Sequence, residues 1–215
     1  MFNQYFTAGE NSVEFLFGHL AVKNIDFATI SLKCILGPQH IDYTLFQDEH
    51  TYYFFHIQNI LTACGNLYNV FYGNSRWQRM NDGSVANRPR LLRETFDIGS
   101  KGFPLVFDKA VRNTNEHFDE RFDLVRWNVG DYNLLDDDMD TEMRATILNH
   151  YHLRTFDRSN GIYYTYVCRD KSGLQQVEVN LKELQKQLAV MKEHIVTHPL
   201  FESRWVDRMP GDILE

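Results

Sequence analysis

The sequence contains no run of eighteen apolar residues, and it does not open with a basic segment followed by an apolar one. It therefore predicts neither a membrane-spanning helix nor a signal peptide. It also lacks a surplus of positive charge, because 22 lysines and arginines face 29 acidic residues, for a net charge of −7. Such a molecule repels nucleic acid as a whole, so RNA binding would need a local basic patch. We expect a soluble, cytoplasmic protein with no membrane partner.

The sequence is also poor in the patterns of metal and cofactor sites. The three cysteines are far apart and form no CxxC pair, which is typical of thiols packed as small core residues in a reducing compartment: Cys34, Cys64 and Cys168. No phosphate-binding glycine loop, nucleophile elbow or zinc spacing occurs. His194 and His198 stand four apart, as in a metal pair, but no third ligand is near in sequence. We predict no metal and no cofactor.

What is present supports one globular domain. The chain has 215 residues, of which 43% are hydrophobic and 14% aromatic, enough for a sizeable core. Apolar residues recur at three- and four-residue steps, so we expect a mainly α-helical bundle of four or five helices. The predicted domain spans residues 1–215, with a core from about 11 to 198.

Capping and turn residues set the expected limits of the helices. Pro89 can open a short helix that Gly99 closes, after turn-forming residues at 73–84. The expected helical segments cover residues 13–35, 48–73, 90–98, 104–127, 141–151 and 180–199, of which 90–98 and 141–151 are short. His56 lies in the second of them, where we interpret it as a core histidine with its hydrogen bonds satisfied.

The C-terminal third changes to strand-forming residues. Asn160-Gly161 is a strong turn signal, residues 162–168 are rich in β-branched and aromatic side chains, and a second turn precedes 176–179. This pattern predicts a β-hairpin at about 162–179. Asn180 can then cap a final helix with one apolar face: Leu181, Leu184, Leu188, Met191 and Ile195.

The densest group of chemically capable side chains lies in the stretch 111–127, which has helical periodicity and contains neither proline nor glycine. His117 can exchange a proton near neutral pH, and the guanidinium of Arg112 can bind phosphate oxygens. The plainer interpretation is a core helix in which Arg112 pairs with Glu116 and His117 forms a local hydrogen bond.

The block Arg112-Asn113-Thr114-Asn115-Glu116-His117 resembles the RN-x3-H motif of the HEPN family (higher eukaryote and prokaryote nucleotide-binding domains). The hairpin-then-helix ending is similar to that of uncharacterised bacterial members. In catalytic members the arginine and histidine form a metal-independent ribonuclease site at a dimer interface. The resemblance implies a homodimeric, RNA-directed endoribonuclease of the toxin or defence type, with a cognate antitoxin or partner protein. Its catalytic residues would be Arg112 and His117, oriented by Asn113 and Glu116.

A dimer is also what the spacing of the motif requires. At about 100° per residue, Arg112 and His117 point about 140° apart on one helix, so a single helix does not aim both at one phosphate. Two copies facing across a two-fold axis could do so. Because many family members are binding modules, a non-catalytic nucleotide-binding or protein-interaction module remains the alternative.

A second candidate site is the arginine-rich segment 76–93, in which Asp82 is the sole acidic residue. Arginines bind phosphates and a tryptophan can stack on a base, so we predict that this segment guides RNA. The predicted RNA-binding residues are Arg76, Trp77, Arg79, Arg88, Arg90 and Arg93. The alternative is a solvated loop whose arginines pair with the protein's own carboxylates.

Overall fold

The computed structural model describes residues 13–38, 41–42, 45–73, 83–99, 101–108, 132–135, 142–143, 145–146, 154–168 and 174–201. Their order is α1 (Val13–Leu36), α2 (Glu49–Tyr72), α4 (Gly83–Thr95), β1 (Tyr132–Leu135), β2 (Arg154–Asp157), β3 (Ile162–Cys168), β4 (Leu174–Asn180) and α8 (Leu181–Val196). The described part is mainly helical, as predicted, with a four-stranded mixed sheet. Within it, every helix is too short or too polar to cross a bilayer.

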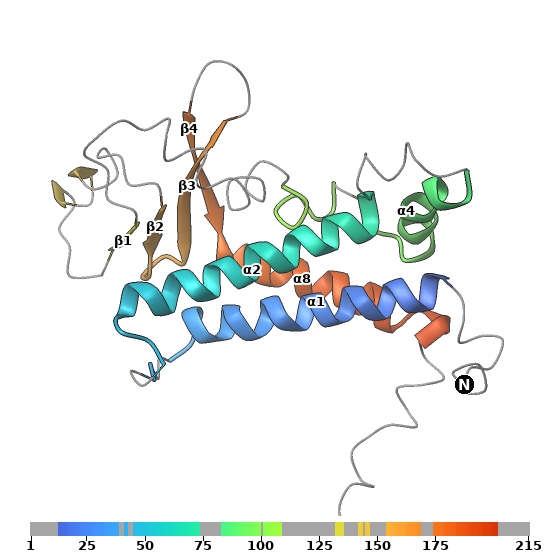
Figure 1. The fold of residues 1–215 in the computed structure, drawn as a ribbon, viewed down its shortest axis with the longest axis horizontal. Helices are drawn as coiled ribbons and strands as arrows, with labels where there is room; N and C mark the ends of the chain where they lie inside the picture. The colour runs from blue at the N-terminus through green and yellow to red at the C-terminus, as the bar shows by residue number, and fades with distance from the viewer. Residues whose placement is uncertain are drawn as a thin grey trace, which may run out of the picture.

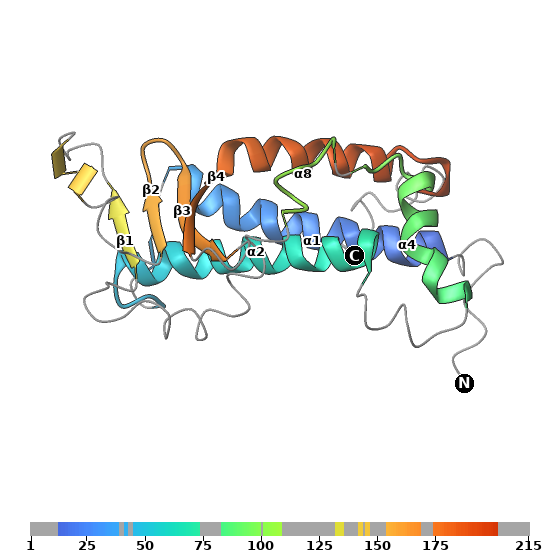
Figure 2. The same cartoon turned by 90° about the horizontal axis from the view of Figure 1, so that it is seen from above.

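Helices α1 and α2 lie side by side and antiparallel, with α8 packed behind them (Figure 1). Figure 2 shows the sheet at one end of this helical layer and α4 at the other. Both central helices match their predicted limits to within one residue. Asp48 begins α2 by accepting a hydrogen bond from the Thr51 amide at 2.6 Å, and Gly73 ends it with a φ of 71°.

Helix α8 confirms the prediction for the C-terminus. The side-chain oxygen of Asn180 accepts a hydrogen bond from the Glu183 amide at 2.9 Å, which satisfies one of the free donors of the first turn. The five predicted apolar residues of this helix are all buried. An ion pair of 2.6 Å between Lys192 and Asp26 joins α8 to α1 at the surface.

The sheet corrects the prediction of a hairpin alone. The hairpin of β3 and β4 is present, and Gly161 turns the chain into β3 with a φ of 68°. However, β2 adds to β3 in antiparallel fashion and β1 adds to β2 in parallel, so the strand order is β1-β2-β3-β4. Strands of four residues are too short for a clear alternating pattern, and a parallel pairing depends on distant residues. Burial of Phe156 against the Tyr53 ring of α2, with centroids 5.4 Å apart, holds β2 in place.

Helix α4 also differs from its prediction. It begins at Gly83 instead of Arg90, so the expected turn at 83–84 is helical and Pro89 lies inside the helix. It ends at Thr95, before the expected limit, because Asp97 takes a left-handed conformation with a φ of 50°. The Ile98 amide then donates to the Arg93 carbonyl at 2.9 Å. Asp97 therefore closes the helix, as was predicted for Gly99. Asn and Asp are the residues other than glycine that most often take this left-handed conformation.

Two further predicted helices fall largely outside the described residues. Of the helix expected at 104–127, residues up to 108 are described, and they form turns in which the Phe107 amide donates to the Phe103 carbonyl at 3.2 Å. Of the helix expected at 141–151, residues 142–143 and 145–146 are helical.

Candidate functional site

The predicted catalytic residues lie outside the described residues: Arg112, Asn113, Glu116 and His117. The same holds for three of the predicted RNA-binding residues: Arg76, Trp77 and Arg79. The described residues that precede the motif end at 108, four residues before Arg112. They include Phe107, whose ring centroid lies 6.1 Å from that of Phe71 and 4.8 Å from that of Tyr72. The residues before the motif are therefore anchored to the C-terminal end of α2.

The three arginines of α4 occupy different environments. Arg93 donates a hydrogen bond to the Phe71 carbonyl, and its guanidinium lies 4.5 Å from the Tyr72 ring, so it holds α4 against α2. Arg90 lies 3.6 Å from Glu94 in an exposed pair of the kind that contributes little to stability.

Arg88 differs from both, because its guanidinium lies 4.2 Å from the centre of the Phe17 ring at the edge of a surface groove. Its buried Nε has no hydrogen-bond partner among the described residues. Of the three, Arg88 is the one that faces a place where a ligand or partner could bind.

The groove runs between α1 and α2. One section has a volume of about 400 Å³ and the next about 450 Å³, and they share Asn24, Phe27 and Asn66, so they are continuous. The first section is lined by Asn24, Phe27, Ile30, Ser31, Phe55, His56, Asn59, Thr62, Ala63 and Asn66. The second is lined by Phe17, Leu20, Lys23, Asn24, Phe27, Asn66, Asn69, Val70 and Arg88.

A polar contact crosses the floor of this groove. Asn24, 5% exposed, accepts a hydrogen bond from the side-chain amide of Asn66 at 2.9 Å and donates one to the Leu20 carbonyl at 2.8 Å. A buried amide costs free energy unless it is paired, so this contact favours one alignment of α1 against α2.

His56 lies at the end of the groove nearer the sheet, half-buried among aromatic rings. Its ring centroid is 4.7 Å from that of Tyr52, 5.3 Å from that of Phe55 and 6.2 Å from that of Phe46. Burial lowers the pKa of His56, and its buried Nδ1 has no hydrogen-bond partner among the described residues. His56 is therefore packed among aromatic rings, but one of its nitrogens lacks the hydrogen bond that we expected of a core histidine.

The rim of the groove is apolar and exposed, which the sequence reasoning missed. Leu20, one of the apolar residues that recur at helical spacing along the first helix, is 44% exposed. Four other large apolar side chains near it are between 50% and 61% exposed: Leu16, Phe27, Ile30 and Phe55. Four of these five residues form a second apolar stripe on α1, which is visible in the sequence, but spacing alone does not indicate which stripe is exposed.

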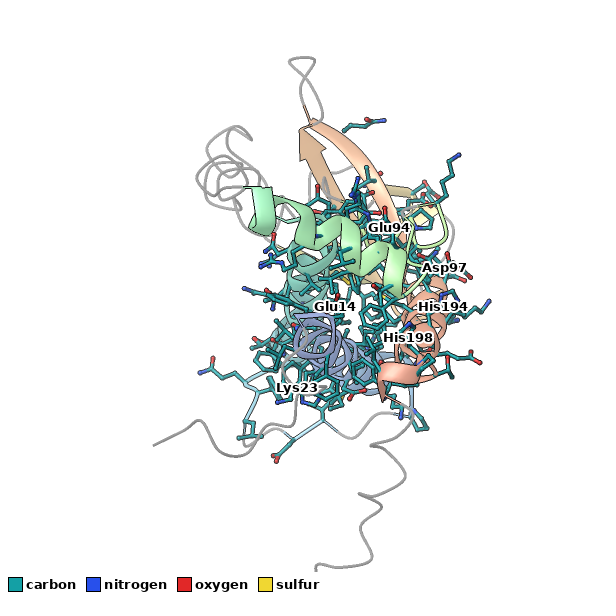
Figure 3. The ribbon with its side chains drawn as sticks, turned by 90° about the vertical axis from the view of Figure 1, so that its right-hand side faces the viewer. Glu14, Lys23, Glu94, Asp97, His194 and His198 are labelled. Atoms are coloured by element: carbon teal, nitrogen blue, oxygen red, sulfur yellow. The ribbon has the colours of Figure 1, made fainter. Side chains whose placement is uncertain are left out.

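His194 lies on α8 and His198 follows the end of that helix, and each contacts a backbone group. His194 Nδ1 lies 3.2 Å from the Asp97 carbonyl, and His198 Nδ1 accepts a hydrogen bond from the Leu200 amide at 3.3 Å. Figure 3 shows both histidines on the side of α8 next to Asp97, away from Lys23. Within the described ranges, no group of three His, Cys, Asp or Glu side chains is arranged to hold a metal ion.

The two cysteines whose side chains are described are free thiols. Cys64 is buried on α2, and burial raises the pKa of its thiol to about 12. Because the thiolate is the reactive form, this cysteine is a core residue and not a nucleophile.

Neither a protein-family model, nor a curated protein, nor a solved structure matches this chain. The geometry of the described residues is therefore what bears on function. An apolar rim, neutral amides and the two cations Lys23 and Arg88 make the groove suited to binding. It offers no pair of nearby acid and base groups among the described residues that line it.

Proposed function

We propose that this protein is an RNA-directed, HEPN-like homodimer that cleaves RNA without a metal, with Arg112 and His117 as its catalytic residues. The observation that carries the proposal is the RNTNEH block at 112–117. It is supported by the mainly helical architecture and by the ending of β3, β4 and α8, both of which the family resemblance leads one to expect.

The proposed reaction uses only groups that these side chains and the RNA provide. Neutral His117 of one copy takes the proton of a ribose 2′-hydroxyl, whose oxygen attacks the adjacent phosphorus. The bond from phosphorus to the 5′-oxygen breaks, and protonated His117 of the other copy gives that oxygen a proton. The products are a 2′,3′-cyclic phosphate and a 5′-hydroxyl. Arg112 binds the phosphate oxygens, on which negative charge builds up in the transition state.

The test is cleavage of structured and unstructured RNA at low salt, with and without a chelator. The wild type should cut with and without the chelator, and His117→Ala and Arg112→Ala should each lose on the order of 100-fold or more in rate. His19→Ala is the matched control, because it removes an exposed histidine from α1 and should leave cleavage unchanged. Circular dichroism checks that every variant is folded. Cleavage that survives both motif substitutions contradicts the proposal.

A second candidate is a non-catalytic dimeric binding module. The α1/α2 groove favours it, because aromatic rings, neutral amides and Arg88 could bind a nucleotide or a partner protein. Folded wild type that cuts no RNA under any of these conditions would favour this candidate over the nuclease.

A further inference from the structure

The exposed apolar residues of α1 have a regular spacing. Leu16, Leu20, Lys23, Phe27 and Ile30 follow one another at steps of four, three, four and three residues. This is the spacing of the core positions of a coiled coil, which bring one seam of a helix against another helix. The buried residues of α1 form a separate stripe toward α2 and α8, so α1 has one seam inside the fold and one outside it.

Helix α2 borders this seam with residues at the same spacing. Phe55, Asn59, Thr62, Asn66 and Asn69 also follow one another at steps of four and three, and all of them line the groove. Phe55 extends the apolar rim, and the other four are uncharged. The seam of α1, the groove and this row of α2 therefore make one continuous surface, called the α1/α2 face below.

We propose that the α1/α2 face is a homodimer interface, in which the α1/α2 pair packs against the same pair of a second copy to form four helices. The first argument is area. An aromatic side chain presents about 150–250 Å² when unburied, so five half-exposed apolar side chains offer on the order of 500 Å². A stable interface buries about 800 Å² per partner, and the polar rows beside the seam can supply the difference.

The second argument is charge. Each copy carries a net charge of −7, so two copies repel unless they meet through a surface free of acidic groups. None of the described residues lining the groove is acidic, and its charged members are Lys23 and Arg88. Asp26 of α1 is instead engaged by Lys192 of α8. The face thus adds no acidic groups to those that make two copies repel each other.

The third argument is self-complementarity. A two-fold axis beside Lys23 would place Leu20 against Phe27 of the second copy, and Leu16 against its Ile30. The members of the first pair are three and four residues from Lys23, and those of the second pair are both seven residues from it. Large apolar residues would then meet on both sides of the axis. The two Lys23 ammonium groups would extend past the seam to water on their aliphatic stems. One lysine among apolar core positions sets the alignment at some cost in stability.

This inference rests on the homodimer of the proposed function and assigns its interface. It holds whether or not the protein cleaves RNA. It is tested by sedimentation equilibrium of the full chain between about 1 and 100 µM, a range that brackets micromolar affinity. Wild type should be dimeric, and Phe27→Glu and Ile30→Glu should each weaken the dimer on the order of 100-fold or more. Lys23→Leu should tighten it several-fold, because it removes the charge from the seam.

The matched control is Val190→Glu, which places the same charge on α8 at a residue that is 46% exposed. It should leave the dimer unchanged. Wild type that stays monomeric, or a dimer that survives both glutamate substitutions in folded protein, overturns the inference. A wild-type dimer that cuts no RNA would overturn the proposed nuclease and leave this interface standing. His117→Ala should remain dimeric while losing cleavage.

Discussion

Gly18 of α1 offers a test in which helix propensity and packing predict opposite signs. In a helix interior, alanine is favoured over glycine by about 0.5–1 kcal/mol, so propensity alone predicts that Gly18→Ala stabilises the protein. The structure predicts the reverse. A Cβ atom at this position would lie 2.7 Å from Cζ of Phe201 and 2.8 Å from Cζ of Phe96, well inside carbon–carbon contact distance.

The packing effect should dominate because neither ring can move into solvent. Phe96 and Phe201 are each 1% exposed, and their centroids lie 6.0 Å apart, so relieving the clash requires the core to shift. Overpacking of this kind costs about 1–3 kcal/mol. After the gain in propensity is subtracted, we expect Gly18→Ala to lower the free energy of unfolding by about 1 kcal/mol. That corresponds to a fall in Tm of about 2–4 °C for a chain of this size.

Urea unfolding followed by circular dichroism measures the change, and two further variants identify its cause. Gly99→Ala is the control for an added methyl group, because a Cβ there meets nothing within 4 Å, and it should change stability by less than about 0.5 kcal/mol. Phe201→Leu should cost less in the Gly18→Ala background than in wild type, with a coupling of at least about 0.5 kcal/mol. A Gly18→Ala protein as stable as wild type would refute the reasoning.

Two further predictions concern local interactions. Because burial lowers the pKa of His56 below its ordinary value of 6.5, the unfolded chain takes up that proton first as the pH falls. The stability that this histidine contributes is therefore present above pH 6.5 and lost below it. In urea unfolding, the free energy of unfolding should fall less between about pH 7 and 5 for His56→Gln than for the wild type. An unchanged pH profile would contradict this. Asn180→Ala should cost about 1 kcal/mol through the lost cap of α8, whereas Asn180→Asp, which keeps the acceptor, should cost much less in the same urea assay. Equal losses in the two variants would refute the capping argument.

Local sequence signals were reliable where a long periodic stretch ended in a clear cap. The limits of α2 follow from Asp48 and Gly73, and the start of α8 follows from Asn180. The hairpin was visible because Asn160-Gly161 precedes seven residues of strong strand formers. Each of these features depends on residues within a few positions of one another.

Local sequence signals were misleading where neighbours distant in sequence decide the structure. Gly83 and Pro89 indicated a loop and a later helix start, but α4 runs through both. Leu134 and Leu135 stood beside a run of aspartates and were not assigned to a strand. They form β1 because β2, nineteen residues after Leu135, supplies a partner.

The candidate sites divide in a similar way. The motif residues Arg112 and His117 were recognised from a six-residue pattern and remain predictions. The groove could not have been predicted, because it needs Asn24 and Asn66, which are 42 residues apart, to meet across two antiparallel helices. Likewise, the arginine-rich segment looked uniform in sequence, whereas the structure gives Arg93 a role in packing and places Arg88 at the groove.

The sequence by itself determined the helical class, the central and final helices, the hairpin and the net negative charge, because periodicity, caps and composition are local properties. The tertiary structure decided which apolar stripe of α1 is buried. Both stripes have helical spacing, and sequence alone does not distinguish them, since burial depends on which faces α2 and α8 cover. The stripe they leave exposed, running from Leu16 to Ile30, is the one that we expect a second copy to cover.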